Sequence, residues 1–142
     1  SFSSRNSMVR NDFLYKDFNA AVDSFRLIPP QPCKNEFLLK HIAKHSFKNT
    51  SDGWLLKSDA TIMRSYQYED LTEIFMDLKC PIYLVYGLMS QIFSQELLDY
   101  TTYVGNLPED RVVGIAGAMH HLFIDEPLTF VEEVKKLLEM RN

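Results

Sequence analysis

The sequence predicts an α/β fold whose second half alternates strands with helices. Residues 81–86 and 111–116 are short, nearly continuous apolar runs rich in β-forming residues. Such runs are typical of strands that a parallel sheet buries on both faces. Amphipathic stretches follow both runs, and the last helix opens with Pro127 after a cap at Asp125 or Glu126. The order strand, helix, strand, helix indicates an α/β layer structure.

The first half of the chain is predicted to contain helices only. Asp17 is a good N-cap for a helix that should end near Ile28, because the proline-rich residues 29–32 cannot continue it. Asn35 can cap a second helix, in which apolar residues share one face and lysines point to water.

A turn, a short extended piece and a third helix should precede the first strand. The turn covers residues 49–53, and the extended piece covers residues 54–56. Apolar residues at helical spacing predict the third helix from Tyr68 onward. Ser94 can cap the helix that lies between the two strands.

Two parallel strands do not make a stable sheet by themselves, because helices and further strands normally cover them. We therefore expect this chain to hold one edge of a larger sheet whose other strands precede Ser1. The chain does not begin with Met, which is consistent with processing, cleavage or trimming upstream.

Composition excludes several classes of function. Apolar residues make up 46% of the chain and charged residues 24%, as in an ordinary folded domain. The net charge is −4 without a run of Lys or Arg, which argues against a nucleic-acid partner. No apolar run approaches the roughly 18 residues that a membrane span needs, and no signal peptide is evident.

The two cysteines, Cys33 and Cys80, are far apart in sequence and lack the spacing of a zinc site. One disulfide between them remains open. We favour two buried thiols in a reducing compartment, and therefore a cytoplasmic location.

Four histidines are candidates for chemistry. His41 and His45 are four residues apart on a predicted helix, which is the geometry of a two-ligand metal pair. No third ligand of suitable type is evident, so we favour partly exposed helix histidines and predict no metal. His120 and His121 directly follow a predicted strand, where open α/β sheets place catalytic groups. Histidine suits general base and acid catalysis, although two solvated loop histidines explain the position equally well.

The stretch from Gly117 to Pro127 resembles the histidine loop of α/β hydrolases: small residues, a His, an apolar triplet, then Asp-Glu-Pro opening the last helix. Cys80 to Gly87 looks like the preceding strand of that fold, which ends at a glycine. Residues 25–32 and 52–54 are similar to the helical lid of one branch of the superfamily. The resemblance covers the whole chain and is most specific from Cys80 to Asn142.

The resemblance implies a helical lid in residues 1–79 and the C-terminal part of an α/β-hydrolase core in residues 80–142. It implies that His120 takes a proton from the nucleophile and passes it to the leaving group. His121 would shape the loop, and a shift of one position would exchange the two roles. The resemblance implies no cofactor.

Two departures from the family pattern concern the partners of His120. No G-x-S-x-G nucleophile motif exists in this chain, so the nucleophile and the oxyanion hole should lie upstream of Ser1. The family commonly has an Asp where Ser90 or Gln91 stands, although some members carry the acid after the previous strand. Asp59 and Asp99 are weaker candidates, interpreted as a lid residue and a solvated helix residue.

These observations leave two functions open. The chain is part of a hydrolase for a small, apolar, ester-like substrate, in which the apolar side chains of Met89, Ile92 and Phe93 line a pocket or belong to the core. Alternatively, it is a truncated, non-catalytic remnant that acts as an interaction module. Its sheet edge would then pair with the N-terminal half of the fold or with a second copy. We expect the isolated chain to be inactive. The sequence is compatible with either a Ser or an Asp nucleophile, and with several classes of substrate.

Overall fold

The computed structural model describes residues 14–58 and 69–140. The chain divides into two compact units, Ser1–Tyr68 and Glu69–Asn142. The lid predicted in residues 1–79 and the hydrolase core predicted in residues 80–142 stay predictions. None of the helices in the described parts has the length and apolar character that crossing a membrane requires.

The two helices of the first unit begin where the sequence predicts. Helix α1 spans Phe18–Ser24, and the side chain of Asp17 accepts a hydrogen bond from the backbone N–H of Ala20 at 2.9 Å. Helix α2 spans Glu36–His45 and is capped by Asn35, which accepts from the N–H of Leu38 at 3.4 Å. Both caps satisfy backbone donors that a helix leaves without partners.

Helix α1 ends at Ser24, four residues before the predicted end at Ile28. Phe25 adopts an extended conformation instead of continuing the helix. The guanidinium of Arg26 donates hydrogen bonds to the carbonyl oxygens of Asp23 and Phe25, at 2.7 and 2.6 Å. These bonds satisfy carbonyl groups near the helix end without another helical turn.

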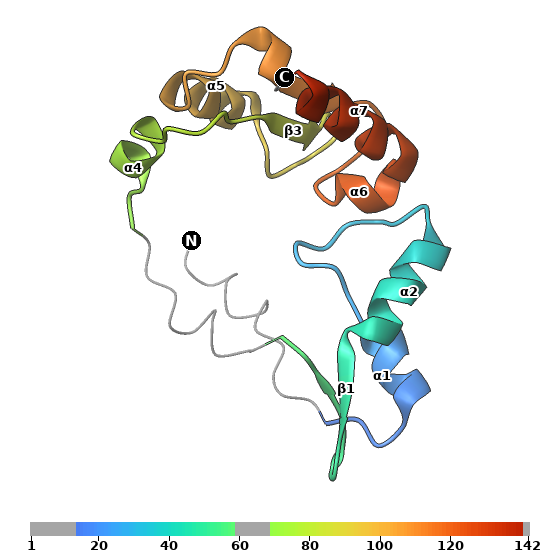
Figure 1. Cartoon of the computed structure of the whole chain (residues 1–142). Helices are drawn as coiled ribbons and strands as arrows, with labels where there is room; N and C mark the ends of the chain where they lie inside the picture. Colours follow the sequence, from blue (N-terminus) through green and yellow to red (C-terminus); the bar gives the residue numbers. More distant parts are fainter. Residues whose placement is uncertain (1–13, 59–68, 141–142) are drawn as a thin grey trace. The chain divides into compact units, whose positions relative to one another are not determined.

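The prediction that the first half contains only helices is wrong, although the extended piece predicted at residues 54–56 is present as part of a strand. Strands β1 (Phe47–Thr50) and β2 (Gly53–Leu56) form an antiparallel hairpin after α2 (Figure 1). Tyr15 adds a bridge to Trp54. Phe47 is buried, and its ring packs edge-on against the ring of Tyr15, with centroids 6.1 Å apart. Lys48 and Asn49 have little tendency to form a strand. The packing of Phe47 against Tyr15 therefore contributes to holding β1 in place.

The second unit contains the two predicted parallel strands. Strand β3 spans Leu84–Gly87 and strand β4 spans Val112–Ile115, with Gly87 opposite Ile115. Helix α5 (Gln95–Val104) connects them and is capped by Ser94, as predicted. The residues of β3 before Gly87 are half-buried rather than buried. A two-stranded sheet leaves part of each strand uncovered, which explains this difference.

Short helices complete the second unit. Helix α4 spans Thr72–Met76 and is shorter than predicted, and the predicted start at Tyr68 lies outside the described residues. A 3-10 turn, η2 (Glu109–Arg111), precedes β4. Helix α6 (Leu122–Asp125) leads directly into α7 (Pro127–Glu139) (Figure 1). The core residues around β4 and these helices are Ile115, Ala118, Ile124 and Leu137.

Candidate functional site

The loops that follow β3 and β4 are joined by backbone hydrogen bonds at the carboxyl end of the sheet. The N–H of Leu88 donates to the carbonyl of Ile115 at 3.0 Å, and the N–H of Met89 donates to the carbonyl of Ala118 at 2.9 Å. Ala118 is fully buried. The loop that carries the histidines is therefore fixed to residues 87–94, named the acid loop because the resemblance implies a catalytic acid there.

Gly87 permits this close approach. A Cβ atom at this position would overlap the carbonyl oxygens of Ala118 and Met119. Gly117, in the histidine loop, has a φ of +77°, which glycine adopts without the strain that other residues meet. The two glycines are thus required for different physical reasons. Gly87 allows the two loops to come into contact, and Gly117 allows a turn.

The histidine pair lies two residues beyond Ala118. His120 is exposed and His121 is half-buried. Their rings meet edge-to-face with centroids 5.4 Å apart, and the ring of His121 also meets that of Phe123 at 6.2 Å. His121 is therefore packed into the loop, while the side chain of His120 is accessible to another molecule.

Asp125 organises the histidine loop in a way that the sequence interpretation missed. Its carboxylate accepts a hydrogen bond from the N–H of Met119 at 2.8 Å. Glu126 is the N-cap residue of α7 but makes no capping bond with its side chain. Asp125 therefore stabilises the backbone next to His120. The available signal was an acid five residues after His120, within the loop motif.

Replacing Asp125 by Asn is expected to loosen the histidine loop, because it removes the charge from a hydrogen bond to a backbone N–H. Bonds to charged groups contribute roughly 1.5–3 kcal/mol, so we expect a loss of about 1–2 kcal/mol in the free energy of unfolding. Urea unfolding measures this loss, and amide exchange at Met119 should be faster. Glu132→Gln, an exposed acid on α7, is the matched control. Equal stability of the two variants would contradict this role.

The acid loop has Ser90 and Gln91, and no carboxylate, at the positions where the resemblance implies an acid. Ser90 is half-buried, its hydroxyl accepts from the N–H of Phe93 at 3.2 Å, and its own N–H donates to the carbonyl of Gly87 at 3.0 Å. Gln91 is exposed. Asp99 is exposed on α5 and accepts from Gln95. Asp59 lies outside the described residues.

The apolar side chains of the acid loop differ in their packing. Met89 and Ile92 are about half exposed, at 53% and 50%. The ring of Phe93 packs against that of Tyr86, with centroids 5.4 Å apart. Phe93 is thus accounted for by packing, whereas Met89 and Ile92 are available to contact a substrate or another part of the protein.

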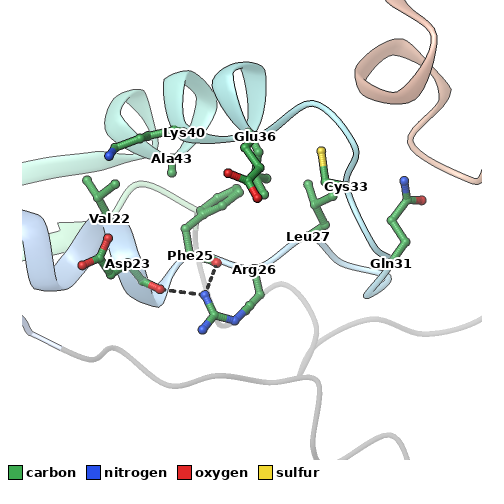
Figure 2. A pocket seen from close by; sticks show the side chains of 11 residues that line it. Val22, Asp23, Phe25, Arg26, Leu27, Gln31, Cys33, Glu36, Lys40 and Ala43 are labelled. Atoms are coloured by element: carbon green, nitrogen blue, oxygen red, sulfur yellow. Dashed lines mark hydrogen bonds between the residues drawn. The ribbon is translucent and has the colours of Figure 1, made fainter.

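The first unit contains a cavity of about 430 Å³. It lies between α1, the segment that follows it, and α2, and Phe25 and Leu27 project into it (Figure 2). Cys33 also lines it and is a half-buried free thiol. Cys80, in the second unit, is an exposed free thiol, so the expectation of two buried thiols is wrong for this residue. The cavity residues all belong to the first unit, whereas His120 belongs to the second.

Solved structures that are similar to this chain include a hydrolase and a thioesterase domain. One is the crystal structure of E-2-(acetamidomethylene)succinate hydrolase, with a TM-score of 0.73, 18% identity, and coverage of 98% of this chain and 53% of that chain. The other is the thioesterase domain from the curacin biosynthetic pathway, with a TM-score of 0.60, 18% identity, and coverage of 95% and 51%. No protein-family model and no curated protein sequence matches.

The chain has an α/β-hydrolase fold. This confirms the predicted fold class, and the second unit contains the predicted order strand, helix, strand, helix. The chain spans about half the length of each similar structure, which agrees with the prediction that it forms part of such a fold. Proteins with this fold catalyse many different reactions, so the activity depends on the residues at the site.

Proposed function

We propose that this chain is part of an α/β-fold hydrolase that cleaves an ester-like bond, with His120 as the general base. The observation that supports this most is the position of His120. It is an exposed imidazole on the loop after β4, at the carboxyl end of a parallel sheet, where this fold places its chemistry. The fold similarity to a hydrolase and a thioesterase domain points in the same direction.

In the proposed reaction, His120 removes a proton from the attacking nucleophile and then gives it to the leaving group. Residues 1–142 contain no G-x-S-x-G motif, so the nucleophile comes from another part of the protein.

The half-exposed side chains of Met89 and Ile92 favour a small, apolar substrate. Residues 1–79 would act as the lid. The two free thiols favour a reducing compartment such as the cytoplasm.

Hydrolysis of p-nitrophenyl esters and thioesters tests this proposal. The complete protein, including the part that carries the nucleophile, is expected to turn over short, apolar esters. Residues 1–142 alone are expected to show no turnover above buffer, because they lack the nucleophile motif. A complete protein that hydrolyses no ester or thioester in such a panel would contradict the proposal.

Placing an acid at Ser90 is expected to increase the activity of the complete protein. A carboxylate that faces the base stabilises the imidazolium formed during catalysis. We expect Ser90→Asp to raise kcat/KM by about tenfold or more, on the scale of 10²–10⁴ that positioned acid–base groups supply. Gln91→Asp is the control, because Gln91 is exposed and Ser90 is half-buried within the loop. A larger gain from Gln91→Asp would assign the acid position to residue 91.

A non-catalytic interaction module is the second candidate. The described part of α7 exposes large apolar side chains, including Leu128 at 79% and Leu138 at 55%. Together with the two-stranded sheet, these side chains favour pairing with the rest of an α/β-hydrolase fold or with a second copy. Size-exclusion chromatography with light scattering on residues 1–142 separates the cases. A dimer would support this candidate, and a monomer at high concentration would argue against self-pairing.

A further inference from the structure

Helix α2 presents two histidines side by side on its surface. His41 and His45 are both exposed, and their ring centroids are 4.4 Å apart with an angle of 33° between the ring planes. Residues four apart on a helix lie one above the other on the same face, which accounts for this contact. The pair belongs to the first unit, whereas His120 belongs to the second.

One hydrogen bond determines the tautomer of His45. Its Nδ1 lies 2.9 Å from the carbonyl oxygen of His41. A carbonyl oxygen only accepts hydrogen bonds, so Nδ1 must carry the proton. In the neutral ring, Nε2 then carries the free lone pair and is ready to bind a metal ion. Metal-binding histidines are commonly oriented in this way, with the other ring nitrogen donating to a backbone carbonyl.

From this geometry we propose that His41 and His45 bind one divalent transition-metal ion through both imidazoles. Within the described residues there is no group of three or more His, Cys, Asp or Glu side chains placed to hold a metal. The pair therefore supplies two ligands, and water or a donor from another molecule completes the coordination. The sequence interpretation favoured ordinary exposed histidines because it required a third ligand from the protein. A chelate formed by two histidines does not need a third protein ligand.

The chemistry of the pair selects the class of metal. Imidazole nitrogens suit Cu²⁺, Ni²⁺ and Zn²⁺, and affinity for such sites follows the order Ni²⁺ < Cu²⁺ > Zn²⁺. Oxygen-seeking cations such as Mg²⁺ and Ca²⁺ should not bind, since the site offers only nitrogen. Lys57, whose ammonium group donates to the carbonyl of His45 at 2.8 Å, adds a nearby positive charge that lowers the affinity for any cation.

Isothermal titration of the purified, untagged protein with Ni²⁺ and with Cu²⁺ tests the proposal. We expect one ion per chain at this site, with Cu²⁺ bound more tightly. His41→Ala and His45→Ala should each lower the affinity by about 100-fold, because losing one of two linked ligands removes the benefit of chelation. His120→Ala and His121→Ala are matched controls that remove a histidine elsewhere, and they should leave the affinity unchanged.

The proposal is overturned if neither ion binds, if His41→Ala retains full affinity, or if His120→Ala weakens binding as much as His45→Ala does. Nitrogen NMR of the metal-free protein gives a second measurement. His45 should show the Nδ1–H form, and its Nε2 resonance should shift or broaden when the ion is added. A metal-free His45 protonated at Nε2 alone would contradict the geometry on which the proposal rests.

Discussion

Replacing His120 by alanine is expected to lower kcat for ester hydrolysis by the complete protein by about 10³-fold, within the range that general acid–base groups contribute. KM should change little, because the substitution removes a proton acceptor rather than a binding surface. The free energy of unfolding should change little, since His120 is exposed and its ring contacts that of His121. Steady-state kinetics and a thermal unfolding curve measure these three quantities.

His121→Ala is the matched control, because the two histidines are adjacent in one loop. His121 is half-buried between the rings of His120 and Phe123, so its removal should lower stability more than activity. We expect a loss of about 1–2 kcal/mol in the free energy of unfolding, as is common for packed side chains. If His121→Ala abolishes turnover while His120→Ala leaves it intact, the base is His121.

Gly87→Ala is expected to be the most destabilising single substitution at the site. The added Cβ would overlap two backbone carbonyl oxygens, those of Ala118 and Met119, in the loop that carries His120. Backbone atoms cannot rotate away as a side chain can. Overpacking of this kind costs about 1–3 kcal/mol and occasionally more, and we expect at least the upper end of that range. Urea unfolding with an unchanged m-value measures it.

Gly114→Ala provides the comparison within the same sheet. The added Cβ would meet chiefly the side chain of Leu88, which is 56% exposed and can change rotamer. We therefore expect a loss smaller than about 1.5 kcal/mol, as for tolerated volume changes. Equal losses for Gly87→Ala and Gly114→Ala would mean that the contact between the two loops does not limit the packing at Gly87.

Much of the fold could be predicted because its signals are local. Asp17, Asn35 and Ser94 are N-caps in the structure, since each side chain bonds to a nearby N–H. Pro127 opens α7, because its fixed φ and missing N–H suit that position. The apolar runs form β3 and β4. The extended piece at residues 54–56 was predicted and is part of β2. Strand β1 and its pairing with β2 were not predicted, because they depend on contacts distant in sequence, such as that of Phe47 with Tyr15.

The candidate site shows the same division. The histidine loop was recognisable because its residues are consecutive. The role of Asp125 was not, because its bond to Met119 exists only after the loop has folded back on itself. The acid loop lies next to the histidine loop because Gly87 pairs with Ile115. This pairing joins parts of the chain that are distant in sequence, so it could not be predicted locally. The nucleophile could not be predicted, since no motif for it occurs in residues 1–142.

Chemical rescue of the His120→Ala variant by imidazole tests the central claim most directly. If His120 is the general base, added imidazole can enter the space that the exposed side chain leaves and accept the proton in its place. Ester hydrolysis by the complete His120→Ala protein should then rise with imidazole concentration, after subtraction of the rate without enzyme. The His121→Ala variant should not respond. A His120→Ala rate that stays at background at every imidazole concentration would contradict the assignment of His120 as the base.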